Sequence, residues 1–378
     1  ITLSRWRPGF ESPWGRQSLK IPASAGIFFW RLPCLWRMMP LVVTPLAVAG
    51  QHPALHRPPP LYTVPMCYSA QISADYAKLV RQYGAVMSLD AFAALYAFDP
   101  AKKRPKTPKA MDDGFGGART PRGQDIVAMI QQWHASEQAE LEAELQRQHE
   151  RLALASTHLA TRPTQKARNE ARVAGNRIAR AHARLEDLQR SQHLPRDNRL
   201  FPGLHAPLLI SENGQRVLKP MRYQCRLADK PARNDVLYPG TYNARRESLQ
   251  GYWRSAFGHR HGVLVVSAFH EHVQRSQQRG SAEPATQVLE FRPDPPQDLL
   301  LACLWAEWEG PEGTLLSFAA ITDTPHPDVA AAGHDRSIVP LRERHLDAWL
   351  NPDPSDLQAQ YRILDDREDL RYVWREAG

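Results

Sequence analysis

The sequence predicts an α+β protein: helices dominate up to about residue 194, and a mixed or largely antiparallel sheet follows. Three observations carry this prediction. Apolar residues recur at helical spacing over residues 73–98, an Ala/Glu/Arg-rich stretch runs over 124–194, and short apolar runs separated by Pro, Gly and Asn begin near Phe201. With 378 residues, of which 42% are hydrophobic, the chain can bury a sizeable core.

Residues 1–65 are expected to be a disordered leader or upstream sequence translated from a mis-assigned start. They contain eleven prolines and show no sustained period. Their one apolar run, 41–50, is interrupted by Pro45 and is too short to span a membrane. Because the first residue is Ile, we favour a mis-assigned start and expect the protein to begin at Met66.

The net charge of +8 belongs mostly to this leader, so it is weak evidence for nucleic-acid binding. Residues 1–65 hold seven Lys or Arg and one acid, which leaves 41 basic and 39 acidic side chains in the rest of the chain.

The first folded part is predicted over residues 66–123. The spacing of apolar residues over 73–98 indicates two short amphipathic helices that are broken near Gly84. The Lys- and Gly-rich stretch from residue 99 to 123 is predicted to be a loop.

Residues 124–194 are predicted to form an inserted antiparallel hairpin of two helices, with a break at 161–163 that contains Pro163. The first helix carries mainly acidic residues and the second mainly basic ones, which favours their pairing. The basic helix contacts DNA or a partner on one interpretation, and is a solvated face balanced by its neighbour on the other, which we favour.

The main part of the fold is predicted over residues 195–378. Its apolar runs predict strands at 207–210, 261–269, 287–291, 299–305 and 314–322. Helices are expected near the end, at about 341–350 and 354–372.

The four cysteines, at positions 34, 67, 225 and 303, are far apart and form no CxxC pair. This usage suggests neither a zinc ribbon nor a disulfide framework and fits a reducing, cytoplasmic setting. We expect no metal and no cofactor.

Reactive side chains occur at four places near predicted strand ends or turns: the Met-Cys pair at 66–67, TYNARRESL at 241–249, SAFHEHV at 267–273 and AAGHDRSIVPL at 331–341. Each has an ordinary structural explanation when taken singly. Together they supply a thiol, an amide, a carboxyl group and an imidazole, which can support covalent chemistry assisted by acid and base.

These motifs and their order resemble the SOS response-associated peptidase (SRAP) family of abasic-site processing proteins. The resemblance rests on the Met-Cys pair, on NAR followed by Glu247 and Ser248, on Phe269-x-Glu271, and on the HDR of residues 334–336. It covers residues 66–72 and most of 195–350. The chain departs from the family pattern in having Tyr68 where Gly is usual, His272 where Trp is frequent, and the helical insertion.

The resemblance implies a mechanism in which Cys67, once N-terminal, captures the aldehyde of an abasic site in single-stranded DNA. Its amine forms an imine, and its thiol closes a thiazolidine ring. By resemblance, Asn243 holds the cysteine and the adduct, Glu271 and His334 transfer protons, and Arg245 and Thr322 contact phosphates. The resemblance also implies self-processing peptidase activity and a protein that we expect to be monomeric and not membrane-bound.

Two other classes of protein stay open. A metal-dependent hydrolase is one, because His259 and His261, and again His270 and His272, are spaced to share one face of a strand. A non-enzymatic scaffold with the helical hairpin as a docking arm is the other.

Overall fold

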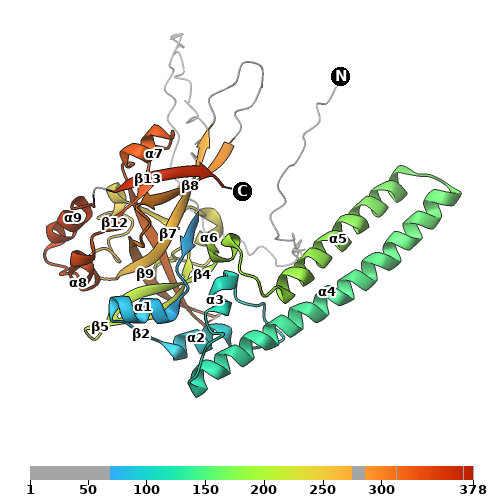
Figure 1. Cartoon of the computed structure of the whole chain (residues 1–378), viewed down its shortest axis with the longest axis horizontal. Coiled ribbons are helices and arrows are strands. Elements are labelled where there is room, and N and C mark those ends of the chain that lie inside the picture. Colours follow the sequence, from blue (N-terminus) through green and yellow to red (C-terminus); the bar gives the residue numbers. More distant parts are fainter. Residues whose placement is uncertain (1–68, 275–285, 312, 369, 378) are drawn as a thin grey trace, which may run out of the picture. The chain divides into compact units, whose positions relative to one another are not determined.

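The strands of the computed structural model form a 13-stranded sheet that closes on itself (Figure 1). The structure describes residues 69–274, 286–311, 313–368 and 370–377. The long strands pair in the order β9-β10-β5-β4-β7, and β7 pairs again with β9, which completes the ring. These strands are β4 (His205–Glu212), β5 (Gln215–Tyr223), β7 (His261–Gln274), β9 (Leu299–Gly310) and β10 (Gly313–Asp323).

Shorter strands extend the sheet beyond this ring. β7 also pairs with β1 and β8, β1 pairs with β3, and β8 pairs with β13, while β2 joins β5, β6 and β11 join β10, and β12 joins β9. Their bounds are β1 (Ser69–Ile72), β2 (Val86–Met87), β3 (Arg199–Leu200), β6 (Asn243–Arg245), β8 (Thr286–Asp294), β11 (Ser337–Ile338), β12 (Pro340–Leu341) and β13 (Arg371–Glu376).

Both faces of the central strands are buried, which explains their nearly continuous apolar sequences. On β7, Leu264 and Val266 belong to one core cluster, while Val263 and Val265 belong to a second. Successive side chains of a strand point to opposite faces, so an uninterrupted apolar run is what a doubly covered strand requires.

The tight β4–β5 hairpin follows from its Asn213-Gly214 turn. Both residues have positive φ, 51° and 77°, and Glu212 faces Gln215 across the hairpin. A two-residue turn of this type matches the twist of antiparallel strands.

Two short helices precede the hairpin insertion, as predicted. α1 (Tyr76–Tyr83) ends at Gly84, whose φ of 58° provides a left-handed cap, and α2 (Leu89–Tyr96) follows. Phe92 and Tyr96 of α2 are completely buried in the first core cluster.

The predicted helical hairpin is confirmed. α4 (Pro121–Thr161) and α5 (Gln165–Gln189) are antiparallel neighbours (Figure 1). Thr120 and Thr164 cap the two N-termini by accepting hydrogen bonds from Gly123 and Ala167. Ion pairs join the helices at Arg151–Glu170 (2.9 Å), Arg177–Glu144 (3.3 Å) and Arg184–Glu137 (2.6 Å).

Two helix predictions are corrected by the structure. The segment predicted as a helix over 354–372 contains α9 (Leu357–Asp365) and then strand β13, because residues 371–376 pair with β8. The predicted helix at 341–350 begins only at η3 (Glu343–His345) and α8 (Leu346–Leu350), after Leu341 has paired within β12.

The remaining helices are short. The stretch predicted as a loop over 99–123 contains α3 (Lys109–Asp113) and the start of α4. α6 (Asn234–Leu237), α7 (Pro327–Ala331) and η2 (Arg246–Ser248) lie in connections between strands, and η1 (Pro195–Asn198) leads from the hairpin into β3. Within the described part of the chain, no helix combines the length and apolar character needed to cross a membrane.

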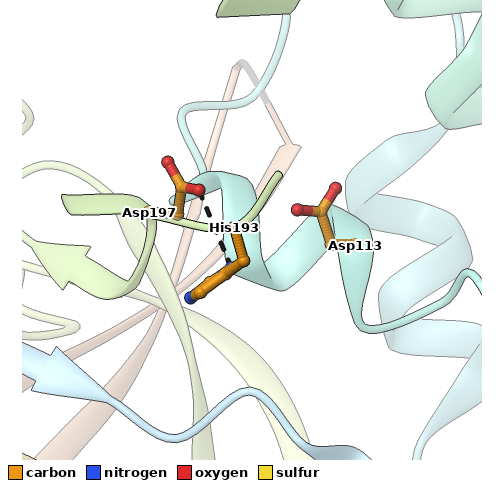
Figure 2. Close-up of side chains that lie close together, drawn as sticks. All are labelled: Asp113, His193 and Asp197. Carbon is orange, nitrogen blue, oxygen red and sulfur yellow. Dashed lines mark ion pairs between the residues drawn. The ribbon is translucent and has the colours of Figure 1, made fainter. Parts of the chain in front are cut away.

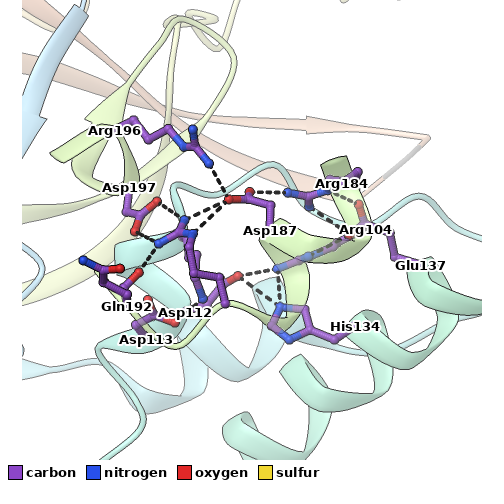
Figure 3. A network of polar contacts seen from close by, with 12 residues as sticks. Arg104, Asp112, Asp113, His134, Glu137, Arg184, Asp187, Gln192, Arg196 and Asp197 are labelled. Carbon is purple, nitrogen blue, oxygen red and sulfur yellow. Dashed lines mark hydrogen bonds and ion pairs between the residues drawn. The ribbon is translucent and has the colours of Figure 1, made fainter. Parts of the chain in front are cut away.

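A polar network joins the base of the hairpin to α2, α3 and η1 (Figure 3). Asp112, which is 6% exposed, accepts hydrogen bonds from Tyr96 (2.7 Å) and Thr107 (2.9 Å) and pairs with Arg104. Arg104 also donates to Glu137 of α4 (3.0 Å), which in turn accepts from Arg184 of α5. The network therefore joins α2, the loop before α3, and both hairpin helices.

A second part of the network ties α5 to the segment that follows it. Arg190 binds Asp187 and, with both terminal nitrogens, Asp197, and Arg196 donates to Asp187 (2.8 Å). The chain thus enters and leaves the hairpin through linked ion pairs.

The network makes stability depend on pH. Burial alone raises the pKa of Asp112, but its hydrogen bonds with His134, Tyr96 and Thr107 and the charge of Arg104 outweigh burial and lower the pKa. For Asp187, contacts with Arg190 and Arg196 likewise outweigh burial and bring the pKa to about 2. A carboxyl group whose pKa is lower in the folded state stabilises the protein above its unfolded value, about 3.9, and loses that contribution as pH falls.

We therefore expect the urea midpoint to fall as pH drops below about 4, the unfolded value, toward about 2, the folded value for Asp187. The midpoint should be measured across this range for the protein and for an Asp112→Asn/Asp187→Asn double variant, whose curve should be flatter. Parallel curves would show that other groups cause the acid sensitivity.

Candidate active site

Glu271 and His334 form a buried acid–base pair inside the fold. Glu271 lies on β7 and is completely buried on the same face as Phe269 and Val273, which belong to the first core cluster. Its Oε2 lies 3.5 Å from Nε2 of His334, which is 4% exposed. The sequence alone could not bring these two residues together, since 63 positions separate them.

The segment after α7 places His334 beside β7. Gly333 has a φ of 96°, and a Cβ at this position would lie 3.1 Å from Val273. Any other residue would be strained by this φ and crowded by β7, so glycine permits the close approach of the two segments.

The imidazole of His334 faces the Glu271 carboxyl group through Nε2 and the Arg336 backbone through Nδ1. The Nδ1 atom of His334 lies 2.7 Å from the Arg336 carbonyl oxygen. The Arg336 amide donates a hydrogen bond to the same Nδ1 atom, at 3.3 Å. The other ring nitrogen, Nε2, faces the carboxyl group of Glu271, and both groups can accept and release protons. The pair can therefore give or take a proton without large movement.

Asn243, Arg245 and Thr322 are brought together by β6 and β10. These strands are parallel, with Asn243 opposite Ala320 and Arg245 opposite Thr322. Asn243 and Thr322 are buried, whereas Arg245 is partly exposed. Among the described residues, the hydroxyl of Thr322 has no hydrogen-bond partner.

An ion pair links this group to the segment of His334. Arg336 binds Glu247 through two nitrogens, at 2.5 and 3.1 Å, and Thr322 of β10 pairs with Ile338 of β11. The sequence analysis did not predict this ion pair between Arg336 and Glu247. The opposite charges in the two motifs could have indicated it.

Cys67 lies outside the described residues. The described chain begins at Ser69, which pairs with His270 next to Glu271. Strand β1 is therefore adjacent to β7 at the position of the buried carboxylate.

The histidine pairs of the metal-hydrolase interpretation are used in other ways. His259 precedes β7 rather than sharing its face with His261. Both ring nitrogens of the buried His261 are engaged, since Nε2 accepts from the Gly258 amide (2.8 Å) and Nδ1 lies 3.0 Å from the Trp349 carbonyl. His270 lies 3.4 Å from Glu290. Among the described residues, neither pair belongs to a group with metal-ligand spacing.

One cluster elsewhere has that spacing, formed by Asp113, His193 and Asp197 (Figure 2). Its carboxylates already serve protein donors. Asp197 accepts from Arg190 at both oxygens and from the Leu194 amide, and Asp113 pairs with Lys109. These contacts account for the cluster as part of the hairpin network.

Trp253 and Phe257, in the segment between β6 and β7, are core residues. They are 3% and 1% exposed and belong to the second core cluster.

The structure thus combines a closed sheet with a buried carboxylate–imidazole pair. Residues 158–376, more than half of the chain, match the family described as SOS response associated peptidase (SRAP), and the chain belongs to this family. Family membership supports a function in the response to DNA damage.

Similar solved structures come from two bacteria. A protein from Bordetella bronchiseptica has a TM-score of 0.40 and 18% identity, covering 50% of this chain and 90% of its own. One from Bacteroides thetaiotaomicron has a TM-score of 0.39 and 11% identity, covering 48% and 78%. A phage-related protein from Bordetella bronchiseptica has a TM-score of 0.36 and 19% identity, covering 48% and 81%. No curated protein matches this chain.

Proposed function

We propose that the protein captures abasic sites in single-stranded DNA as a covalent thiazolidine adduct on Cys67. The observation that carries this proposal is the buried Glu271–His334 pair, 3.5 Å apart, next to the strand that follows Cys67 in the chain. Two residues of extended chain span at most about 7 Å, so the Cα atom of Cys67 lies within about 7 Å of that of Ser69.

The chemistry needs two nucleophiles on one residue. The Cys67 amine adds to the sugar aldehyde, and the resulting hydroxyl leaves as water, which gives an imine. The thiol sulfur then adds to the imine carbon, while the nitrogen takes up the thiol proton. One water is released, and nothing is oxidised or reduced.

Glu271 and His334 serve this sequence as a proton relay. One proton is delivered to the departing hydroxyl, and another is accepted as the amine nitrogen loses its charge. A positioned acid–base group of this kind accelerates such steps by about 10²- to 10⁴-fold. Asn243 orients the cysteine and the adduct. Glu271 and His334 also assist removal of the residues before Cys67, which is the self-processing reaction.

Arg245 and Thr322 contact phosphates beside the abasic site. Their backbones are in register on β6 and β10, so a guanidinium and a hydroxyl lie on neighbouring strands. A phosphate accepts hydrogen bonds from both types of group, and Arg can bind it with two nitrogens.

The test is an adduct assay on the chain begun at Met66, after intact mass has verified that Cys67 is N-terminal. The protein is incubated with a single-stranded oligonucleotide that carries one abasic site and is run on a denaturing gel. A heat-resistant band is expected without reductant. A longer form with an uncleaved leader should give none, since its Cys67 nitrogen is an amide.

The Cys67→Ser variant distinguishes formation of the imine from closure of the thiazolidine ring. It retains the amine but lacks the thiol, so its imine should be trapped only when borohydride is added. An unreduced, heat-resistant band in Cys67→Ser would contradict the thiazolidine, and no band from the verified Met66-started protein would contradict the function.

A further inference from the structure

The outward face of α5 carries three arginines that the hairpin does not use. Arg168, Arg172 and Arg180 are exposed, and no ion pair joins them to a carboxylate among the described residues. Arg172 makes one hydrogen bond, to Asn169 of its own helix. By contrast, Arg177 and Arg184 pair with glutamates of α4.

The position of these arginines follows from the seam between the helices. The buried residues of α5 are Ala167, Ala174 and Ala181, which repeat every seven positions. At 3.6 residues per turn, Arg172 lies about 160° around the helix from Ala174, and Arg168 and Arg180 lie about 120° away on either side. All three therefore point away from α4.

The three arginines form an oblique row. Arg168, Arg172, Asn176 and Arg180 follow one another at intervals of four residues, each rising about 6 Å and turning about 40°. The row spans about 18 Å. The glutamates of α4 therefore pair with only part of the basic residues of α5, and these three arginines lie on its solvated face.

We propose that this row, which we call the arginine row, binds the phosphate backbone of single-stranded DNA. The inference rests on the proposed function in that it takes the same DNA as ligand. Guanidinium groups bind phosphates in a charge-assisted, two-point geometry. A flexible single strand can follow a row that winds around the helix, whereas a rigid duplex cannot.

The arginine row binds the charged phosphates of DNA and does not distinguish base sequence. Helix α5 contains no Phe, Tyr or Trp on which a base can stack, so the contact is confined to the backbone. Binding through it is therefore strongly dependent on salt and independent of base composition.

The test measures binding of the Met66-started protein to an undamaged single-stranded oligonucleotide at several salt concentrations by fluorescence anisotropy. The variant is Arg168→Gln/Arg172→Gln/Arg180→Gln. Each phosphate contact on a single strand contributes about 0.7 to the slope of log K against log salt, so the triple variant should have a slope shallower by about 2.

A matched control removes the same charge elsewhere. Arg81, Arg119 and Arg371 are also exposed and make no ion pair within the described ranges. They lie on α1, before α4 and on β13. The Arg81→Gln/Arg119→Gln/Arg371→Gln variant should keep the original slope.

Three results overturn the inference: an unchanged slope in the α5 variant, an equal loss in the control, or a loss seen only with a matched duplex. This assay does not involve the Cys67 reaction. A shallower slope without any adduct supports the arginine row and refutes the proposed function, and an adduct with unchanged slope does the reverse.

Discussion

Replacing Glu271 by Gln is expected to slow adduct formation by about 10²- to 10⁴-fold, the contribution of a positioned acid–base group. Gln keeps the shape of Glu and can still hydrogen-bond to His334, which lies 3.5 Å away, but it cannot exchange a proton. The rate should be measured as the growth of the heat-resistant band with protein in excess over abasic DNA. Thermal unfolding of the same variant separates a lost reaction from a lost fold.

A glutamate of the neighbouring strand β8, which lies opposite His270 of β7, provides a control. Glu290 is also a buried glutamate beside a histidine, with Oε2 3.4 Å from His270. His270 is adjacent to Glu271 in the strand, so the two side chains point to opposite faces. Glu290→Gln should leave the adduct rate within a few-fold. Equal losses in the two variants would mean that the rate reports general disturbance of β7, and the proton-relay role would be wrong.

Replacing Asp112 by Ala is expected to destabilise the protein by about 3–5 kcal/mol, the effect of breaking a buried charge pair from one side. The substitution removes the carboxylate that pairs with Arg104 and accepts from Tyr96 and Thr107. Tyr96 is completely buried, so its hydroxyl would be left without an acceptor in the core. The measurement is the free energy of unfolding in urea near neutral pH.

The neighbouring Asp113 is the control for this substitution. Its carboxylate is 43% exposed and pairs only with Lys109 within the described part of the chain. Exposed pairs contribute little, so Asp113→Ala should cost less than about 1 kcal/mol. Similar losses for the two variants would show that Asp112 has no special part in holding the hairpin base.

The helices of the first half were predictable because their signals are local. Gly84 ends α1, and the break near Pro163 separates α4 from α5, as their sequences indicate. Apolar spacing and capping residues act within a few positions of each other, so a single sequence is enough to read them.

The strands at the edges of the sheet were not predictable in this way. Residues 371 and 372 were predicted as the end of a helix, yet they begin β13, which pairs with β8, whose residues lie about 80 positions earlier. β5 was missed as well, although Asn213-Gly214 is a strong hairpin turn. Strand formation depends on the partner that the fold supplies, and a local pattern does not contain that partner.

In the candidate site, too, local features were predictable from the sequence and contacts between distant segments were not. Its residue types were identifiable from the motifs, but the contact of Glu271 with His334 depends on the turn at Gly333, and the clamp of Arg336 on Glu247 joins segments 89 positions apart. Asn243, Arg245 and Thr322 meet only because β6 and β10 are parallel and in register. Cys67 stays a prediction, since it lies outside the described residues.

The turn between α4 and α5 offers a place for a reporter. Residues 161–164 are all exposed, and Thr164 caps the helix that follows. Exposed loop tips tolerate inserted residues well. A short enzymatic labelling tag placed after Pro163 would carry a fluorophore without consuming a cysteine or altering any strand. One labelled molecule would then report both the approach of a DNA strand, through its fluorescence, and covalent capture, through its mobility on a gel.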